Sequence, residues 1–240
     1  MAQTELWYGY PLVRSELDGR EVTLVRPNGV SNGKWLLKTE YFGAFPAFEV
    51  EMLARGWHVA HIRNITRWNL PEDTDAKALL VRHLHEKYGL EEKCVPVGMS
   101  CGGLQGIHFA AKYPQYVHCL YLDAPVVNLL SCPAGYGMAQ TDAMEEMLAA
   151  LHLTRITLLS YRDHPLDRLP ALVESRVPVV LVSGDSDRTV PYEENGALLA
   201  QAYADTGIPF ELHLKPGGDH HPHGLEDNAP LIEFVEKYSR

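Results

Sequence analysis

A single serine lies between glycines in the segment Gly98-Met99-Ser100-Cys101-Gly102. The residues before it, 93–97, have the short apolar pattern of a buried strand, and residues 104–113 have the pattern of a helix. A G-x-S-x-G segment in this setting predicts a sharp turn that exposes the serine hydroxyl at a helix N-terminus. Backbone N–H groups at that position can stabilise a developing oxyanion, and the flanking glycines avoid collisions with the strand and the helix. We therefore predict that Ser100 is a nucleophile.

A serine at neutral pH is a poor nucleophile and needs a base, which in turn needs a group that orients it. Both kinds of residue follow Ser100, in the segments 183–191 and 215–224, each directly after an apolar run. The candidate acids and bases in these segments are Asp185, Asp187, His220, His221 and His223. The order serine, aspartate, histidine is the one expected when the three groups follow successive strands of a single sheet.

The elements that must position these residues begin with an antiparallel pair, predicted at 7–14 and 20–26 around the turn dipeptide Asp18-Gly19. Strand and helix patterns then alternate to the end of the chain. We predict strands at 34–41, 57–63, 93–97, 117–122, 177–182 and 210–214, and helices at 46–55, 73–87, 104–113, 193–204 and 225–238. This order indicates an open, mostly parallel, twisted sheet covered by helices.

One segment interrupts the alternation, because about fifty residues separate Asp123 from Val177. A helix is predicted within it at 142–153, with Asp142 and Glu145 spaced as a capping box. An insertion of this length is more often functional than neutral. We therefore expect residues 1–240 to form one domain in which residues 124–176 form a small cap over the active site.

The composition is that of a globular enzyme, with 46% hydrophobic and 22% charged residues among 240. The net charge of −10 argues against nucleic acid or an anionic membrane as a partner. The sequence shows neither a transmembrane run nor the pattern of a signal peptide. Four cysteines without C-x-x-C spacing predict reduced core thiols, so we expect a cytoplasmic protein.

From about Lys34 to the C-terminus, the chain resembles the α/β-hydrolases of the esterase and lipase type, whose relatives are often labelled prolyl-oligopeptidase-like. In that superfamily the acid stands in a G-x-x-D-x-x-V-P pattern, which here selects Asp187 within the segment 184–191. The base follows a glycine-rich turn, which selects His220. The resemblance thus implies the α/β-hydrolase fold and the triad Ser100, Asp187 and His220.

Several residues compete for these roles. Asp185 is two residues from Asp187, and Asp123 follows a predicted strand that supplies the acid in some hydrolases of this fold. His221 and His223 compete with His220, and the three histidines also raise the question of a metal site. Their spacing is too compressed for the usual zinc patterns, so we predict no metal.

An oxyanion hole needs two donors, and the first is expected to be the backbone N–H of Cys101, the residue after the nucleophile. The second is expected from the loop after the strand that ends near Glu40. This loop lacks the family's His-Gly signature and reads Tyr41-Phe42-Gly43. The backbone N–H of Tyr41 is the predicted second donor, with Phe42 as the alternative.

These roles predict a serine hydrolase that cleaves a small carboxylic ester, such as an acylated carbohydrate, through an acyl-enzyme on Ser100 and without a cofactor. Two alternatives stay open: a small peptidase or amidase of the same fold, and a slow hydrolase that acts as a ligand receptor. The expected partner is the small-molecule substrate, and no oligomeric state is predicted.

Overall fold

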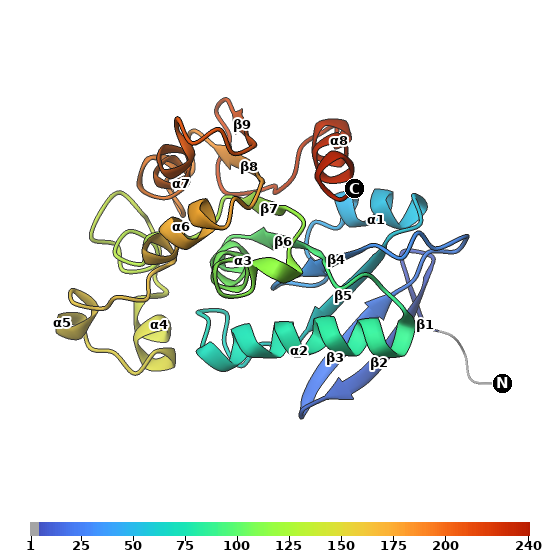
Figure 1. Ribbon diagram of the computed structural model, residues 1–240. Helices are drawn as coiled ribbons and strands as arrows, with labels where there is room; N and C mark the ends of the chain where they lie inside the picture. The colour runs from blue at the N-terminus through green and yellow to red at the C-terminus, as the bar shows by residue number, and fades with distance from the viewer. Residues whose placement is uncertain (1–4) are drawn as a thin grey trace.

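The computed structural model describes residues 5–240, whose strands form one nine-stranded sheet with the order β1-β2-β3-β5-β4-β6-β7-β8-β9 (Figure 1). The strands are β1 (Glu5–Trp7), β2 (Tyr10–Leu17), β3 (Arg20–Val25), β4 (Trp35–Lys38), β5 (His58–Ile62), β6 (Val95–Met99), β7 (Leu120–Asp123), β8 (Val179–Gly184) and β9 (Phe210–Lys215). The pairs from β1 to β3, and the pair of β3 with β5, are antiparallel, whereas every pair from β5 to β9 is parallel. The expected mostly parallel sheet with antiparallel N-terminal strands is confirmed.

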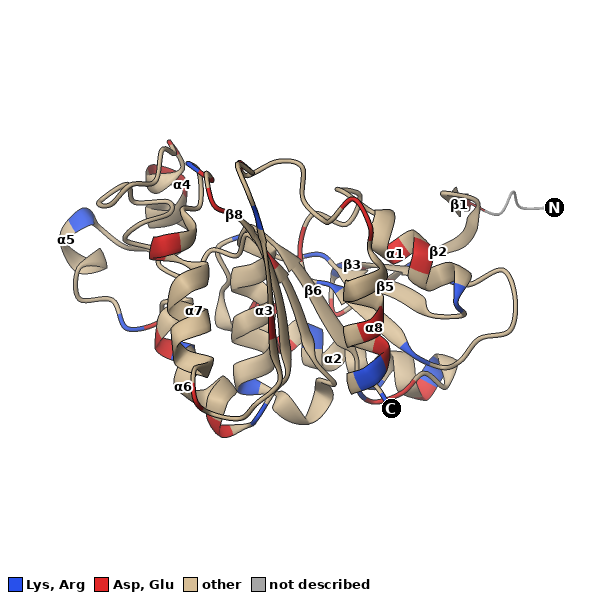
Figure 2. Ribbon diagram, turned by 90° about the horizontal axis from the view of Figure 1, so that it is seen from above, with Lys and Arg blue, Asp and Glu red and all other residues tan. Residues whose placement is uncertain are grey.

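Helices cover both faces of this sheet. Those outside the segment 124–176 are α1 (Ala47–Ala54), α2 (Pro71–Tyr88), α3 (Cys101–Lys112), α7 (Gly196–Tyr203) and α8 (Ala229–Tyr238), with short 3-10 turns at Pro114–Tyr116 and Tyr192–Glu194. One apolar core joins α2, α3 and α7 to one face, and a second joins α1 and α8 to the other. Figure 2 shows the two helical layers with β6 and β8, which carry no charged residue, between them.

Several boundaries differ from the predictions, and two of the differences have a clear local cause. The strand expected at 7–14 is split, because Tyr8 and Gly9 adopt positive φ angles of 49° and 84° and turn the chain between β1 and β2. The terminal helix expected from Leu225 begins at Ala229, and Pro230 lies in its first turn, where a missing N–H costs no hydrogen bond.

The segment 124–176 contains α4 (Met144–Ala150), α5 (Arg155–Leu158) and α6 (Pro165–Glu174). The helix α6 joins the layer formed by α3 and α7, whereas α4 and α5 extend beyond the sheet (Figure 1). The predicted capping box is wrong, because Ala143 occupies the N-cap position of α4 and no side chain caps it. Glu145 instead pairs with Arg155 on the surface.

The loops after β4, β6, β7, β8 and β9 all leave from the same edge of the sheet, since these strands are parallel. This is the edge at which open α/β sheets bind ligands. All four cysteines are buried free thiols, as predicted. Among residues 5–240, no helix has the length and apolarity needed to cross a bilayer.

Candidate active site

Ser100 lies on a strained turn between β6 and α3, with φ 54° and ψ −120°. Its N–H donates to the Asp123 carbonyl oxygen at 2.9 Å, and its carbonyl oxygen accepts from Gly103 N–H at 2.9 Å. A Cβ atom on Gly98 would lie 2.4 Å from the Gly102 carbonyl oxygen. The steric reason for a glycine at position 98 is therefore confirmed, and the turn holds a serine in a conformation that L-residues rarely adopt.

The structure brings Ser100, Asp187 and His220 together from the loops after β6, β8 and β9. His220 Nε2 lies 3.1 Å from Ser100 Oγ, and His220 Nδ1 lies 2.8 Å from Asp187 Oδ2. The aspartate and the histidine are each only 5% exposed. This chain of hydrogen bonds allows a base to take the serine proton while a buried carboxylate stabilises the resulting imidazolium.

The Asp187 carboxylate is held by its own loop. Its Oδ1 accepts the backbone N–H groups of Thr189 and Val190, each at 2.8 Å, which leaves Oδ2 for His220. Both oxygens of the acid therefore have defined donors, and its orientation toward the imidazole is fixed.

A second contact, between Asp219 and Arg188, joins the loops that carry the acid and the base. Asp219 Oδ1 accepts the N–H groups of Arg188 and His220 at 3.1 and 2.8 Å, and Oδ2 pairs with the Arg188 guanidinium at 3.0 Å. These hydrogen bonds lower the pKa of Asp219 to about 2. Asp219 thus links the two loops, and its position next to the predicted base His220 was the available signal in the sequence.

The competing acids lie elsewhere in the site. The Asp185 carboxylate is exposed and accepts Gly217 N–H at 2.7 Å. Asp123 is buried and pairs with His223, whose Nδ1 lies 2.7 Å from Oδ1 of Asp123. Two aspartate–histidine pairs therefore lie in this site, and of the two it is the pair that includes Asp187 that is hydrogen-bonded to Ser100.

Cys101 and Tyr41, the residues predicted to supply the oxyanion donors, have side chains that lie next to each other. Cys101 is the first residue of α3, so its N–H has no acceptor within the helix. Tyr41 has a positive φ of 53°, and its N–H lies 3.3 Å from Oε1 of the adjacent Glu40. Its phenol lies beside the Cys101 thiol and accepts from Arg67 at 3.4 Å, and burial raises the pKa of this phenol well above its ordinary value.

A buried polar network fixes the loop that carries Tyr41. Asn64 donates to Glu40 Oε2 at 2.7 Å and to the Thr39 carbonyl oxygen at 2.8 Å. The amine of the fully buried Lys77 in turn donates to Asn64 Oδ1 at 2.6 Å and to Gln105 Oε1 at 2.7 Å. The sequence interpretation missed this network, whose members lie on separate elements.

The segment 124–176, which contains α4, is attached to this region at several points. Glu146 of α4 pairs with Arg67 and accepts from Trp68 Nε1 at 3.0 Å. At the other end, the buried Asn195 side chain accepts Val127 N–H and Asn128 N–H, both at 3.0 Å. An apolar cluster joins the segment to the turn after Ser100; it includes Cys101, Leu104, Val126, Leu129, Met147, Leu148 and Leu158.

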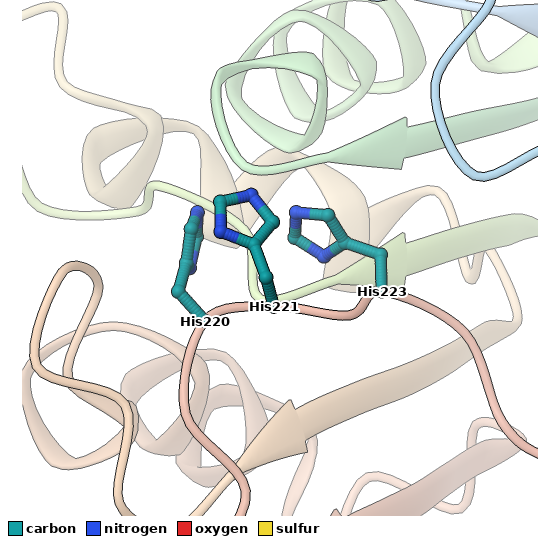
Figure 3. A group of neighbouring side chains, drawn as sticks. All are labelled: His220, His221 and His223. Carbon is teal, nitrogen blue, oxygen red and sulfur yellow. The ribbon is translucent and has the colours of Figure 1, made fainter.

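Two further features adjoin the site. A cavity of about 110 Å³ lies beside His223 and is lined by Phe45, Met99, Tyr121 and Leu225, among others. His220, His221 and His223 each offer a ring nitrogen, and these nitrogens lie within 4.8 Å of one another (Figure 3). His223, which is paired with Asp123, belongs to both features.

Residues 57–239 match the model of the prolyl oligopeptidase family. The chain is 25% identical over 152 residues to the acylamino-acid-releasing enzyme of Rattus norvegicus. The aligned region covers 61% of this chain and 20% of that enzyme. Its fold is similar to that of a puromycin hydrolase S511A mutant, with a TM-score of 0.74, 17% identity and 97% of this chain covered. It is also similar to Porphyromonas gingivalis dipeptidyl peptidase 4, with a TM-score of 0.70, 15% identity and 96% coverage. The chain spans 39% and 35% of those two structures.

Proposed function

Because the chain belongs to the prolyl oligopeptidase family of serine hydrolases, we propose that it hydrolyses the amide bond of small peptides or acylated amino acids. The observation that carries this proposal is the hydrogen-bonded chain from Ser100 through His220 to Asp187. The named relatives are peptidases, which favours amide substrates over the carboxylic esters that we expected from the sequence. The assignment of Ser100, Asp187 and His220 as catalytic residues is part of the proposal.

The proposed reaction begins when Ser100 Oγ attacks the substrate carbonyl carbon and His220 Nε2 takes the serine proton. Asp187 stabilises the imidazolium through Nδ1. The imidazolium then protonates the leaving amine, which is expelled as the acyl-enzyme forms. A water molecule, deprotonated by the same His220, hydrolyses the acyl-enzyme and releases the acid.

The developing oxyanion would be bound by Cys101 N–H and by a donor from Tyr41. The Tyr41 N–H already contacts the Glu40 carboxylate, whereas its phenol lies beside Cys101 and accepts from Arg67. Arg67 occupies one lone pair of the phenol oxygen, and the phenol, which keeps its proton at neutral pH, is hydrogen-bonded to the Cys101 thiol. This O–H would turn from the thiol to the oxyanion when a substrate binds. We therefore include the phenol as a second possible donor beside the predicted backbone N–H.

The segment that contains α4 supports a preference for small substrates. It packs against Cys101 and Leu104 and is tied to Arg67, so it lies next to the proposed oxyanion donors. We propose that it acts as the cap that limits access to Ser100. The 110 Å³ cavity beside His223 has the size of a small side chain or acyl group and is the proposed place for one.

The test compares amide and ester substrates that share one acyl group. N-acetylated and free aminoacyl p-nitroanilides are assayed beside the matching p-nitrophenyl esters, with Ser100→Ala as the matched control. We expect turnover of both classes by the wild type and of neither by the variant. Turnover of the esters alone would favour a carboxylic-ester hydrolase, the expectation from the sequence, over the proposed amidase.

A further inference from the structure

Three histidines follow one another on the loop after β9 and gather beside Ser100. The ring centroid of His220 lies 4.8 Å from that of His221 and 4.9 Å from that of His223, and the last two are 5.1 Å apart. Figure 3 shows the three rings side by side, rising from the same loop. One nitrogen from each ring lies within 4.8 Å of the other two. Only His220 has a role in the proposed hydrolysis.

Buried carboxylates orient two of these rings. His220 Nδ1 is held by Asp187 at 2.8 Å, and His223 Nδ1 is held by Asp123 at 2.7 Å. A carboxylate acceptor keeps the proton on Nδ1 and leaves the lone pair on Nε2. Histidines that bind metals usually have this second partner, which fixes the tautomer and the orientation of the ring.

The third ring, His221, has no hydrogen-bonding partner within residues 5–240. Phe45 stacks on it with a centroid distance of 5.5 Å and an interplanar angle of 16°, and the same Phe45 lies edge-on to His223 at 5.2 Å. Stacking on its face restrains the ring while leaving both nitrogens, which lie on its edge, available. His221 is the exposed member of the group, so it can rotate toward the other two.

We propose that His220, His221 and His223 bind a divalent cation of the zinc type, and that the bound cation inhibits the hydrolase. This inference rests on the proposed function for its inhibitory effect, although the binding itself does not. Neutral imidazoles are preferred ligands of Zn²⁺, with Zn–N distances of about 2.0–2.1 Å, which places tetrahedral ligands about 3.3 Å apart. The three ring nitrogens, which now lie within 4.8 Å of one another, would move closer together on binding, and the exposed His221 is the ring with the most room to move.

The inhibition follows from the atom that the cation occupies. Coordination uses the Nε2 lone pair of His220, which is the lone pair that accepts the proton of Ser100. The hydrogen bond between these two residues is then lost, and the serine has no base. The carboxylates of Asp187 and Asp123 contact Nδ1 of His220 and of His223, so they balance the charge of the cation from the far side of these rings. Water or Ser100 Oγ would fill the fourth coordination position of the cation.

Binding is tested first, on the Ser100→Ala variant, so that no activity is required. Isothermal titration calorimetry with ZnCl₂ in a buffer that does not chelate metals should show one Zn²⁺ per chain, and Co²⁺ should give the absorption of a four-coordinate site. Adding His221→Asn or His223→Asn to this variant should weaken the affinity by at least about tenfold, the lower end of the loss caused by removing even an outer-shell partner. Absence of stoichiometric binding, or equal affinity in all three proteins, would overturn the proposal.

Inhibition is tested second, on the catalytically competent chain. The concentration of ZnCl₂ that halves the rate is measured for the wild type, for His221→Asn and for His85→Gln. His85 is an exposed histidine at the end of α2, so its variant controls for nonspecific binding of zinc. Each protein is normalised to its own metal-free rate, and a cooperative melting transition measured without zinc checks that each is folded. We expect a shift of at least about tenfold for His221→Asn only.

Activation by zinc, or equal inhibition of all three proteins, would contradict an inhibitory site. If the chain has no hydrolase activity, the calorimetric result still decides whether the cation binds.

Discussion

Replacing Asp187 by asparagine reverses one hydrogen bond while keeping the shape of the side chain. In the structure, Asp187 Oδ1 accepts the N–H groups of Thr189 and Val190, and Oδ2 faces His220 Nδ1 at 2.8 Å. The amide oxygen of an asparagine is required by the two backbone donors, so its NH₂ group must face the histidine. His220 Nδ1 then becomes an acceptor and the ring proton moves to Nε2, where it points at Ser100.

A histidine with its proton on Nε2 cannot accept the serine proton. The variant should therefore lose as much kcat as an enzyme whose catalytic histidine is held in the wrong tautomer. Such a change costs on the order of 10⁴ in kcat in a Ser-His-Asp triad. This factor corresponds to about 5.5 kcal/mol of transition-state stabilisation. The overall stability should change far less, because the two backbone hydrogen bonds of the loop are kept.

The assay is the steady-state hydrolysis of an aminoacyl p-nitroanilide and of the matching p-nitrophenyl ester by three variants. Asp187→Asn is compared with Asp123→Asn, which alters the other buried aspartate–histidine pair, and with Asp185→Asn, which alters an exposed carboxylate. We expect the large loss only for Asp187→Asn. A greater loss of kcat for Asp123→Asn or Asp185→Asn, in folded proteins, would refute the assignment of the acid.

Three further predictions follow from the site and its supports. EDTA should not lower the rate of hydrolysis, because Ser100 and His220 supply the nucleophile and the base, and removal of an inhibitory cation would only raise the rate. Loss of activity on chelation that a divalent cation restores would contradict this. Met147 is a fully buried residue of α4, so Met147→Ala should lower the free energy of unfolding by about 2–5 kcal/mol. The variant should also shift the substrate preference toward longer acyl chains. An unchanged preference would mean that α4 packs on the rest of the domain without lining the substrate site. Burial lowers the pKa of Lys77 from 10.5 to about 7, so between these values the unfolded chain binds more protons and stability should rise with pH. Urea unfolding across this range should show a smaller rise for Lys77→Met, and an identical rise would contradict the shift.

The nucleophile turn and the order of the strands were predictable because their signals are local. Gly98, Ser100 and Gly102 lie within four residues of one another in the sequence, and short apolar runs mark the parallel strands. The segments that carry Asp187 and His220 could be located by the same logic, since each follows a strand that ends at the same edge of the sheet. The choice of these two residues within the segments rested on the resemblance to the α/β-hydrolases. The structure places these three side chains within hydrogen-bonding distance of one another.

Contacts between distant elements could not be predicted in this way. The partner of His223 is Asp123, one hundred residues earlier, and neither residue carries a local signal for the other. The capping box predicted at the N-terminus of α4 was wrong for a related reason. Glu145 forms a surface ion pair with Arg155 and does not cap the helix. The ion pair of Arg67 with Glu146 likewise depends on how α4 packs against the loop after β5.

The central claim is that Ser100 is a nucleophile activated by His220, and covalent labelling tests it most directly. The wild type, Ser100→Ala and His220→Gln are incubated with a fluorophosphonate probe, and the labelled peptide is identified by mass spectrometry. We expect rapid labelling of the wild type at Ser100, no labelling of Ser100→Ala and labelling of His220→Gln that is slower by orders of magnitude. Labelling of Ser100→Ala at another residue, or equal labelling rates for the wild type and His220→Gln, would contradict the claim.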